Sequence, residues 1–399
     1  MKKFNKFLSV AVASAMVMAM AGCGNTDNGS AATGTNAATE SAASGSVFKI
    51  GGIGPTTGAA AIYGSAVQHG AEIAVEEINA AGGINGYQVE FKFQDDEADA
   101  EKSVNAYNAL KDWGAQIIDG STTSGACIAV TDKTKEDNMF QITPSGSAVE
   151  CVQYDNNFRV CFSNPNQGLA SAQYIGENGL AEKIAVIYDS SDVYSSGIYE
   201  KFAKEAENQP FEIVAAEAFT ADNKTDFSVQ LQKAKDAGAD MVFLPIYYQE
   251  SALILTQAAA MGYAPKWFSC DGMDGILGGV DNFDVSLTEG VMLLTPFAAD
   301  ATDDLTQSFV TKYKEKYGET PNQFAADSYD AIYVIKAAIE KSGVTPDMSV
   351  SDICDGMKAA MTEITVDGLT GNGMTWTADG EANKAPKAVV IENGAYKAM

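Results

Sequence analysis

The 399-residue sequence is poor in basic residues and contains a single histidine, His69. Lysine and arginine number 26 against 53 aspartates and glutamates, which gives a formal net charge of −27. That deficit excludes the clustered cations that nucleic acids and anionic membrane surfaces require. One histidine is too few for most histidine-built metal sites and Ser-His-Asp triads. The composition predicts an acidic protein of two domains or lobes, with no metal, no cofactor and little catalytic equipment.

Motifs typical of redox, zinc and hydrolase sites are also missing. No two of the six cysteines are spaced as Cys-x-x-Cys, which argues against a zinc ribbon or a redox motif. The Gly-x-Ser-x-Gly nucleophile elbow is absent as well.

The N-terminus has the pattern of an export signal. Lys2, Lys3 and Lys6 precede an apolar run at residues 7–20. This run is shorter than the roughly 20 residues of a membrane-spanning helix but suits a signal peptide. Residues 20–23, Met-Ala-Gly-Cys, resemble a bacterial lipobox, so we expect residues 1–22 to be removed and Cys23 to carry lipid such as palmitate. The alternative is an ordinary secretory signal in which Cys23 is incidental.

The segment after Cys23 is too polar to fold by itself. Residues 24–46 are rich in Ser, Ala, Gly, Thr and Asn, so we expect residues 23–46 to form a flexible tether. Removal of residues 1–22 leaves 23 basic against 53 acidic residues, a formal charge of −30. The expected location is the outer face of the cytoplasmic membrane, or the periplasm, reached through the lipid anchor.

From residue 47 onward the hydrophobic period alternates between that of strands and that of helices. Strands are predicted at 47–53, 87–93, 115–119, 139–142, 183–188, 211–218, 241–246, 266–269 and 290–295. Helices are predicted at 64–81, 99–113, from 124, and at 195–208, 226–237, 249–261, 303–317 and 325–341. Near-continuous apolar strands between helices indicate an α/β fold of two Rossmann-like lobes with parallel sheets.

The loops after these strands are the candidate site, because ligands of open α/β sheets bind at the carboxyl ends of strands. Residues 52–58 read Gly-x-Gly-x-x-x-Gly with Pro55, which disfavours a dinucleotide site. Residues 120–126 and 143–147 offer hydroxyls and helix N–H groups to a carboxylate, although each can be only an N-cap. Asp271, with tyrosines in neighbouring loops, can accept an ammonium group or simply form a turn. Together the loops suit an amino acid zwitterion.

Several motifs then give the chain a family resemblance. They lie at residues 50–58, 63–64, 74–86, 94–97 and 158–160, and the stretch Ile-Asn-Ala-Ala-Gly-Gly-Ile-Asn-Gly-Tyr is the most specific. The chain resembles the type I periplasmic binding proteins of ABC transporters, in the branched-chain amino acid (Leu/Ile/Val) receptor family. The resemblance covers residues 47 to about 397.

The resemblance implies roles for seven residues. Ser124 would bind the ligand carboxylate, Ser145 would contribute backbone groups, and Ser147 stands where the family usually has a threonine that binds both ends of the zwitterion. Asp271 stands where many members carry an ammonium-binding glutamate, so its arm is one methylene shorter and the ligand can be smaller or differently seated. Tyr63 of the first lobe and Tyr194 and Tyr247 of the second would line the pocket.

The resemblance also implies a lobe layout and partners. Lobe 1 would comprise residues 47–165 with 295–372, and lobe 2 residues 166–294 with 373–399, joined by three hinge crossovers. The protein would be a monomer that closes around a small amino acid and delivers it to an ABC permease.

In an exported protein a disulfide is permitted. Cys151 and Cys161 flank a polar turn and form the favoured pair. Free buried thiols are the alternative, and the better interpretation for Cys127 and Cys354.

Two other functions remain open at this point. One is an exported amidase or peptidase-like hydrolase with Ser124 or Cys270 as nucleophile, which the missing histidine partner disfavours. The other is a sensor that uses the same clamshell for an amide or carboxylate ligand.

Overall fold

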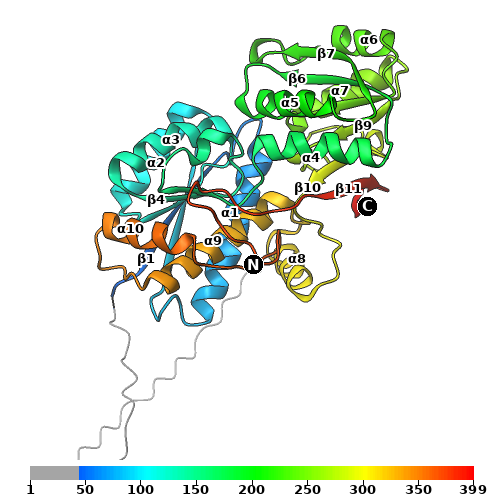
Figure 1. The fold of residues 1–399 in the computed structure, drawn as a ribbon. Helices are drawn as coiled ribbons and strands as arrows, with labels where there is room; N and C mark the ends of the chain where they lie inside the picture. The colour runs from blue at the N-terminus through cyan, green and yellow to red at the C-terminus, as the bar shows by residue number, and fades with distance from the viewer. Residues whose placement is uncertain (1–44) are drawn as a thin grey trace, which may run out of the picture. The chain divides into compact units, whose positions relative to one another are not determined.

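A computed structural model describes residues 45–399. The predicted signal peptide, the lipidated Cys23 and nearly all of the tether lie outside the described residues. Within them, none of the helices combines the length and the apolar character needed to span a bilayer. The described residues form twelve strands and ten α-helices, arranged around two sheets (Figure 1).

The first sheet has five parallel strands in the order β2-β1-β3-β4-β5. Its strands are β1 (Phe48–Gly54), β2 (Val89–Asp95), β3 (Ile117–Asp119), β4 (Phe140–Thr143) and β5 (Asn157–Arg159). The register sets Ile50 of β1 beside Phe91 of β2 and Ile117 of β3.

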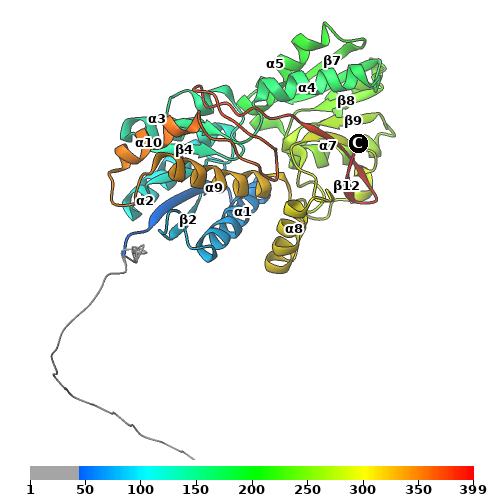
Figure 2. The ribbon, with the colours of Figure 1, turned by 60° about the horizontal axis from the view of Figure 1, so that its bottom comes forward.

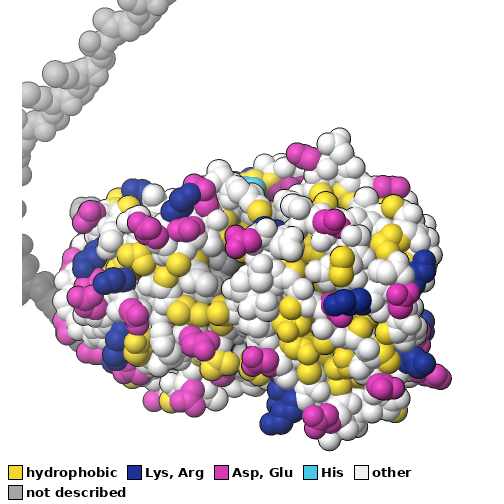
Figure 3. All heavy atoms as spheres, turned by 90° about the horizontal axis from the view of Figure 1, so that it is seen from above, with side chains coloured by type: hydrophobic (Ala, Val, Ile, Leu, Met, Phe, Trp, Pro, Cys, Tyr) yellow, Lys and Arg dark blue, Asp and Glu magenta, His cyan; other side chains and the backbone are white. Residues whose placement is uncertain are grey.

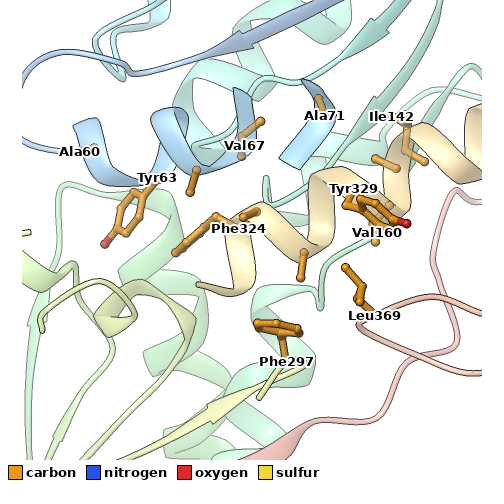
Figure 4. Close-up of a cluster of buried hydrophobic side chains, with 14 of the residues drawn as sticks. Ala60, Tyr63, Val67, Ala71, Ile142, Val160, Phe297, Phe324, Tyr329 and Leu369 are labelled. Carbon is orange, nitrogen blue, oxygen red and sulfur yellow. The ribbon is translucent and has the colours of Figure 1, made fainter. Parts of the chain in front are cut away.

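Both faces of the first sheet are covered because apolar residues point alternately up and down along its strands. Phe48 and Ile50 join the core beside α1 (Ala61–Ala80) and α9 (Gln323–Ser342), whereas Ile53 packs with Leu110 on the other face. That other face is covered by α2 (Ala100–Trp113) and α3 (Ser124–Asp137). Figure 4 shows part of the α1–α9 core, with Ile142 and Val160 beside the two helices.

The second sheet has seven strands in the order β12-β11-β10-β9-β8-β6-β7. They are β6 (Lys183–Asp189), β7 (Glu212–Phe219), β8 (Met241–Leu244), β9 (Lys266–Ser269), β10 (Met292–Thr295), β11 (Lys387–Glu392) and β12 (Ala395–Ala398). The first five are parallel, and β11 and β12 join as an antiparallel hairpin at one edge (Figure 2).

Four helices cover the second sheet. Ile184 and Phe243 pack with α4 (Asn164–Glu177) and α5 (Val193–Ala206), while Val242 and Leu244 belong to the core shared with α6 (Ser228–Asp236) and α7 (Tyr248–Ala260). These alternating strand residues explain why the runs read as continuously apolar in sequence.

The chain passes between the two sheets three times. It goes from β5 to α4, then from β10 to α8 (Asp304–Tyr317) and α9, and finally from α10 (Val350–Met361) to β11. Helices α9 and α10 pack near strand β4 of the first sheet although they follow the second sheet in sequence. This arrangement confirms the predicted α/β fold with two parallel-sheet lobes.

Most of the predicted elements are present, with ends shifted by a few residues. The predicted elements do not include α4, α10 or β5, and the C-terminal strands β11 and β12 were expected only from the family resemblance. Helix α4 begins at Asn164 and Pro165, residues typical of a turn, and β5 is only three residues long. Figure 3 shows acidic, basic and hydrophobic side chains interspersed on one face, as on an ordinary solvated surface.

Candidate ligand-binding site

A small cavity of about 10 Å³ lies where loops from both sheets meet. Its volume is that of roughly one water molecule. Six of the seven predicted site residues line it, namely Tyr63, Ser124, Ser145, Tyr194, Tyr247 and Asp271. Thr122, Thr123, Gly272 and Phe324 complete the wall. The seventh, Ser147, is buried behind Ser124, and the two hydroxyl oxygens are 3.5 Å apart.

The hydroxyl side of the cavity is built at the start of α3. Ser124 is the first residue of this helix, and its Oγ accepts hydrogen bonds from the backbone N–H groups of Ser147 (3.2 Å) and Ala148 (3.1 Å). Ser145 donates its hydroxyl to the Thr122 carbonyl at 2.6 Å. The positive end of the α3 dipole and its first N–H groups favour an anionic group at this wall.

The acidic side of the cavity is Asp271, which follows β9. One carboxylate oxygen accepts from the Tyr194 hydroxyl (2.6 Å) and the other from the Gln167 amide (2.8 Å). Burial raises the pKa of Asp271 to about 6, although the hydrogen bonds from Tyr194 and Gln167 oppose that shift. A cationic group at this wall would favour the ionised form of the carboxyl group.

Aromatic rings close the space between these two walls. Tyr63, in the first turn of α1, donates its hydroxyl to the Gly272 carbonyl and accepts from the Tyr248 N–H at 3.3 Å. Its ring lies 4.3 Å from that of Phe324, centroid to centroid, and the two are neighbours in Figure 4. Tyr194 and Tyr247 stack with centroids 5.0 Å apart. Elements of both sheets therefore contact each other through the site.

The histidine and the two candidate nucleophiles of the sequence analysis have the following surroundings. His69 is stacked on Tyr317, with ring centroids 3.7 Å apart, and is not among the residues that line the cavity. Cys270 is fully buried, and burial raises the pKa of its thiol well above the usual value. Neither Ser124 nor Cys270 has the neighbouring base that an activated nucleophile needs among the described residues.

A model of the periplasmic binding protein family matches residues 47–395. The chain belongs to the periplasmic binding protein family. The match spans nearly all of the described residues, so it includes the first sheet, the second sheet up to the start of β12 and every residue that lines the cavity.

Relatives assign this periplasmic binding protein to the type I, branched-chain amino acid group. It is 30% identical over 300 residues to the Leu/Ile/Val-binding protein homolog 3 of Brucella melitensis, covering 75% of this chain and 80% of that one. It is 30% identical over 303 residues to the leucine-, isoleucine-, valine-, threonine-, and alanine-binding protein of Pseudomonas aeruginosa, covering 74% and 79%. The LivJ substrate-binding protein of Streptococcus pneumoniae, solved with isoleucine, superposes with a TM-score of 0.79 at 28% identity, covering 88% of this chain and 99% of that one.

In this periplasmic binding protein a buried arginine shapes the hydroxyl wall, which the sequence analysis missed. Arg159, at the end of β5, is fully buried and donates to four consecutive carbonyls, those of residues 146–149, at 2.7–3.4 Å. Because these carbonyls turn toward Arg159, the N–H groups of Ser147 and Ala148 turn toward Ser124. Arg159 is therefore a positioning residue for the wall.

Two glutamines at the acidic wall were also missed. Gln167 of α4 binds the Asp271 side chain, and Gln323 of α9 donates to the Asp271 carbonyl at 2.9 Å. Both are distant from Asp271 in sequence, so only the fold brings them there. The Asn-Pro pair at residues 164–165, which starts α4, was the one local signal near Gln167.

The predicted disulfide between Cys151 and Cys161 is wrong. All five cysteines of the described residues are free and buried. Cys151 instead lies against Cys127 and Ala148, because Arg159 holds the short helical turn Val149–Val152 beside α3. The free thiols expected for Cys127 and Cys354 are confirmed.

Proposed function

We propose that this protein is an exported solute-binding lipoprotein of an ABC transporter that captures a small amino acid, of branched-chain type or related, for its permease. One observation carries the proposal: a carboxylate and a helix N-terminus with hydroxyls form opposite walls of one buried cavity. The names of the relatives, which include Leu/Ile/Val-binding proteins, support the same ligand class.

In the proposed complex the ligand carboxylate lies at the hydroxyl wall. Its proposed donors are the Ser124 hydroxyl, backbone groups at Ser145 and the first N–H groups of α3, with the Ser147 hydroxyl behind Ser124, and the helix dipole adds a favourable field. The ligand ammonium binds Asp271, whose present partners Tyr194 and Gln167 are neutral. Charge-assisted hydrogen bonds to a buried carboxylate are stronger than neutral ones, so this wall provides the selectivity for an amino group.

The cavity volume supports a closing motion. A space of about 10 Å³ admits no amino acid, so the walls must separate for the ligand to enter. The walls come from both sheets, with Tyr63 of α1 bound to Gly272 after β9. We propose that residues 47–165 with 295–372 move against residues 166–294 with 373–399 about the three crossovers.

The remaining parts of the proposal follow from the N-terminal sequence. Residues 1–22 act as the signal peptide, Cys23 carries the lipid, and residues 23–46 tether the monomeric binding domain to the membrane. The protein performs no catalysis in this role.

Calorimetric titration of the purified full chain with a panel of amino acids tests the function. We expect at least one α-amino acid to bind, and we expect Asp271→Ala to weaken its binding by at least about 30-fold, since truncating a buried charged partner costs about 2–5 kcal/mol. The exposed Asp226 lies in the same sheet's loops and serves as the control, with Asp226→Ala leaving affinity unchanged.

Unchanged affinity in Asp271→Ala would remove this residue from the site. If the protein turned over an amide substrate and bound no amino acid, it would be a hydrolase and the proposed receptor function would be wrong.

A further inference from the structure

A second cavity, of about 280 Å³, adjoins the small one. The two share Thr123 and Tyr247 as wall residues, so the second cavity begins where the first ends. A ligand whose head group occupies the first cavity can extend its side chain into this neighbour. Its volume is close to the roughly 300 Å³ at which small-molecule pockets begin.

The wall of the second cavity combines apolar surface with an excess of negative charge. Val193, Phe219 and Ile246 provide apolar surface. The charged groups on the wall are the carboxylates of Asp189, Asp192 and Glu250 and the single ammonium of Lys224.

Lys224 is engaged with one of these acids. Its Nζ lies 3.0 Å from a Glu250 carboxylate oxygen. Asp189 and Asp192 have no lysine or arginine within 4.0 Å among the described residues. Asp189 accepts from Ser191 (2.8 and 2.6 Å), and Asp192 accepts from the Tyr194 N–H (3.0 Å) and from the Tyr247 hydroxyl. These donors are neutral, and both carboxylates retain acceptor capacity.

Thr123 supplies an independent sign of a missing polar partner. The residue lines both cavities and is only 6% exposed, yet its hydroxyl has no hydrogen-bond partner within residues 45–399. Thr123 occupies the N-cap position of α3 without making the capping bond. An unsatisfied buried hydroxyl is unfavourable, and a polar ligand atom between the two cavities would satisfy it.

We infer that the ligand is an amino acid with a long side chain that ends in a cation, an ammonium or a guanidinium, held in the second cavity by Asp189 and Asp192. This inference rests on the amino acid class of the proposed function, because the zwitterionic head group must occupy the first cavity, and it replaces the branched-chain side chain named there by a basic one. The aliphatic stem packs on Val193, Phe219 and Ile246, and the cation meets the two unpaired carboxylates. A leucine side chain would cover these carboxylates without pairing them, which is unfavourable.

Lysine and norleucine test the inference, because norleucine has the same number of side-chain carbons and lacks the terminal ammonium. Calorimetry of the purified full chain is expected to give lysine, ornithine or arginine at least 10-fold higher affinity than norleucine and leucine. In Asp189→Asn/Asp192→Asn the preference for the cationic ligand over norleucine is expected to fall to within about threefold. Asparagine retains the N-cap bond of α5, so the variant is built to fold.

Asp222→Asn is the matched control, because Asp222 is an exposed acid next to the cavity residue Ala221 but lines neither cavity. It is expected to keep the full preference. If norleucine or leucine binds the unaltered protein as tightly as the basic amino acids, the inference fails and the proposed function stands. If the preference exists but survives in the double variant, the second cavity is not where the cation binds. If no amino acid binds at all, the proposed function fails and the inference with it.

Discussion

Asp271 is held in the folded protein by neutral donors rather than by a cation. Tyr194 and Gln167 satisfy its two oxygens, and burial still raises its pKa to about 6. A carboxylate that is desolvated and lacks an opposite charge gains more from an incoming ammonium than an exposed one would. The same residue therefore lowers the stability of the free protein at neutral pH and favours the proposed ligand.

The raised pKa of Asp271 predicts a pH dependence of binding. The ionised carboxyl group binds the ammonium, so affinity is expected to hold between about pH 8 and pH 7 and to fall below about pH 6, approaching tenfold per unit. Calorimetry across that range measures this, with Asp271→Asn as a variant whose residual affinity stays flat. If the affinity of the unaltered protein does not change over this pH range, protonation of Asp271 does not control binding.

Helices α1 and α9 pack against each other, and each supplies one aromatic ring to the cavity wall. Tyr63 lies in the first turn of α1 and Phe324 at the start of α9. The helices approach so closely at Gly70 that a Cβ there would lie 2.0 Å from the Ala325 carbonyl oxygen. The absence of a side chain at this position therefore sets the spacing of the two helices and of the two rings.

Gly70→Ala is expected to lower the free energy of unfolding by about 1–3 kcal/mol, because backbone must move to admit the methyl group. Gly125→Ala is the matched control: Gly125 is also helical, but an added Cβ meets nothing within 4 Å. That variant should gain about 0.5–1 kcal/mol from helix propensity. Urea denaturation of both measures the difference, and equal stability would contradict the close approach.

Across the whole molecule, buried acids and the large negative charge both make the free energy of unfolding depend on pH. Burial raises the pKa of Asp96 and of Asp119 to about 7 and that of Asp274 to about 6. Each of the three has one carboxylate oxygen without a partner. The folded state holds the protons of these three carboxyl groups more tightly than the unfolded chain does. The protonated carboxyl groups therefore contribute their full stability below about pH 4, and this contribution is lost as the pH rises through about 6–7.

The free energy of unfolding is therefore expected to be higher at about pH 5 than at about pH 8. Asp119→Asn keeps an acceptor for the Ser328 hydroxyl (2.9 Å) and should reduce the difference by at least about 1 kcal/mol. Denaturant titrations at both pH values measure it. If the difference in the free energy of unfolding between the two pH values is unchanged in Asp119→Asn, the pH effect comes from general charge repulsion instead.

The class of fold and most of the elements could be predicted from the sequence, because alternating strands and amphipathic helices leave a periodic pattern. It also pointed to the loops that line the cavity, since the carboxyl ends of parallel strands meet at one edge. The hydrophobic period did not reveal β5, α4 or the terminal hairpin. Strand β5 has only three residues and β12 four, and α4 begins with a turn-like Asn-Pro pair, so each carries little periodicity.

The contacts between residues distant in sequence could be found only in the folded protein. Arg159 reaches the carbonyls of residues 146–149, Gln167 reaches Asp271 across about a hundred residues, and Cys151 faces Cys127 rather than Cys161. Such contacts depend on how two sheets and their crossovers pack, and no local pattern encodes them. The acidic second cavity is of the same kind: Asp189 and Asp192 come from the junction of β6 and α5 and Glu250 from α7, and they adjoin the site only when these elements and α3 are assembled.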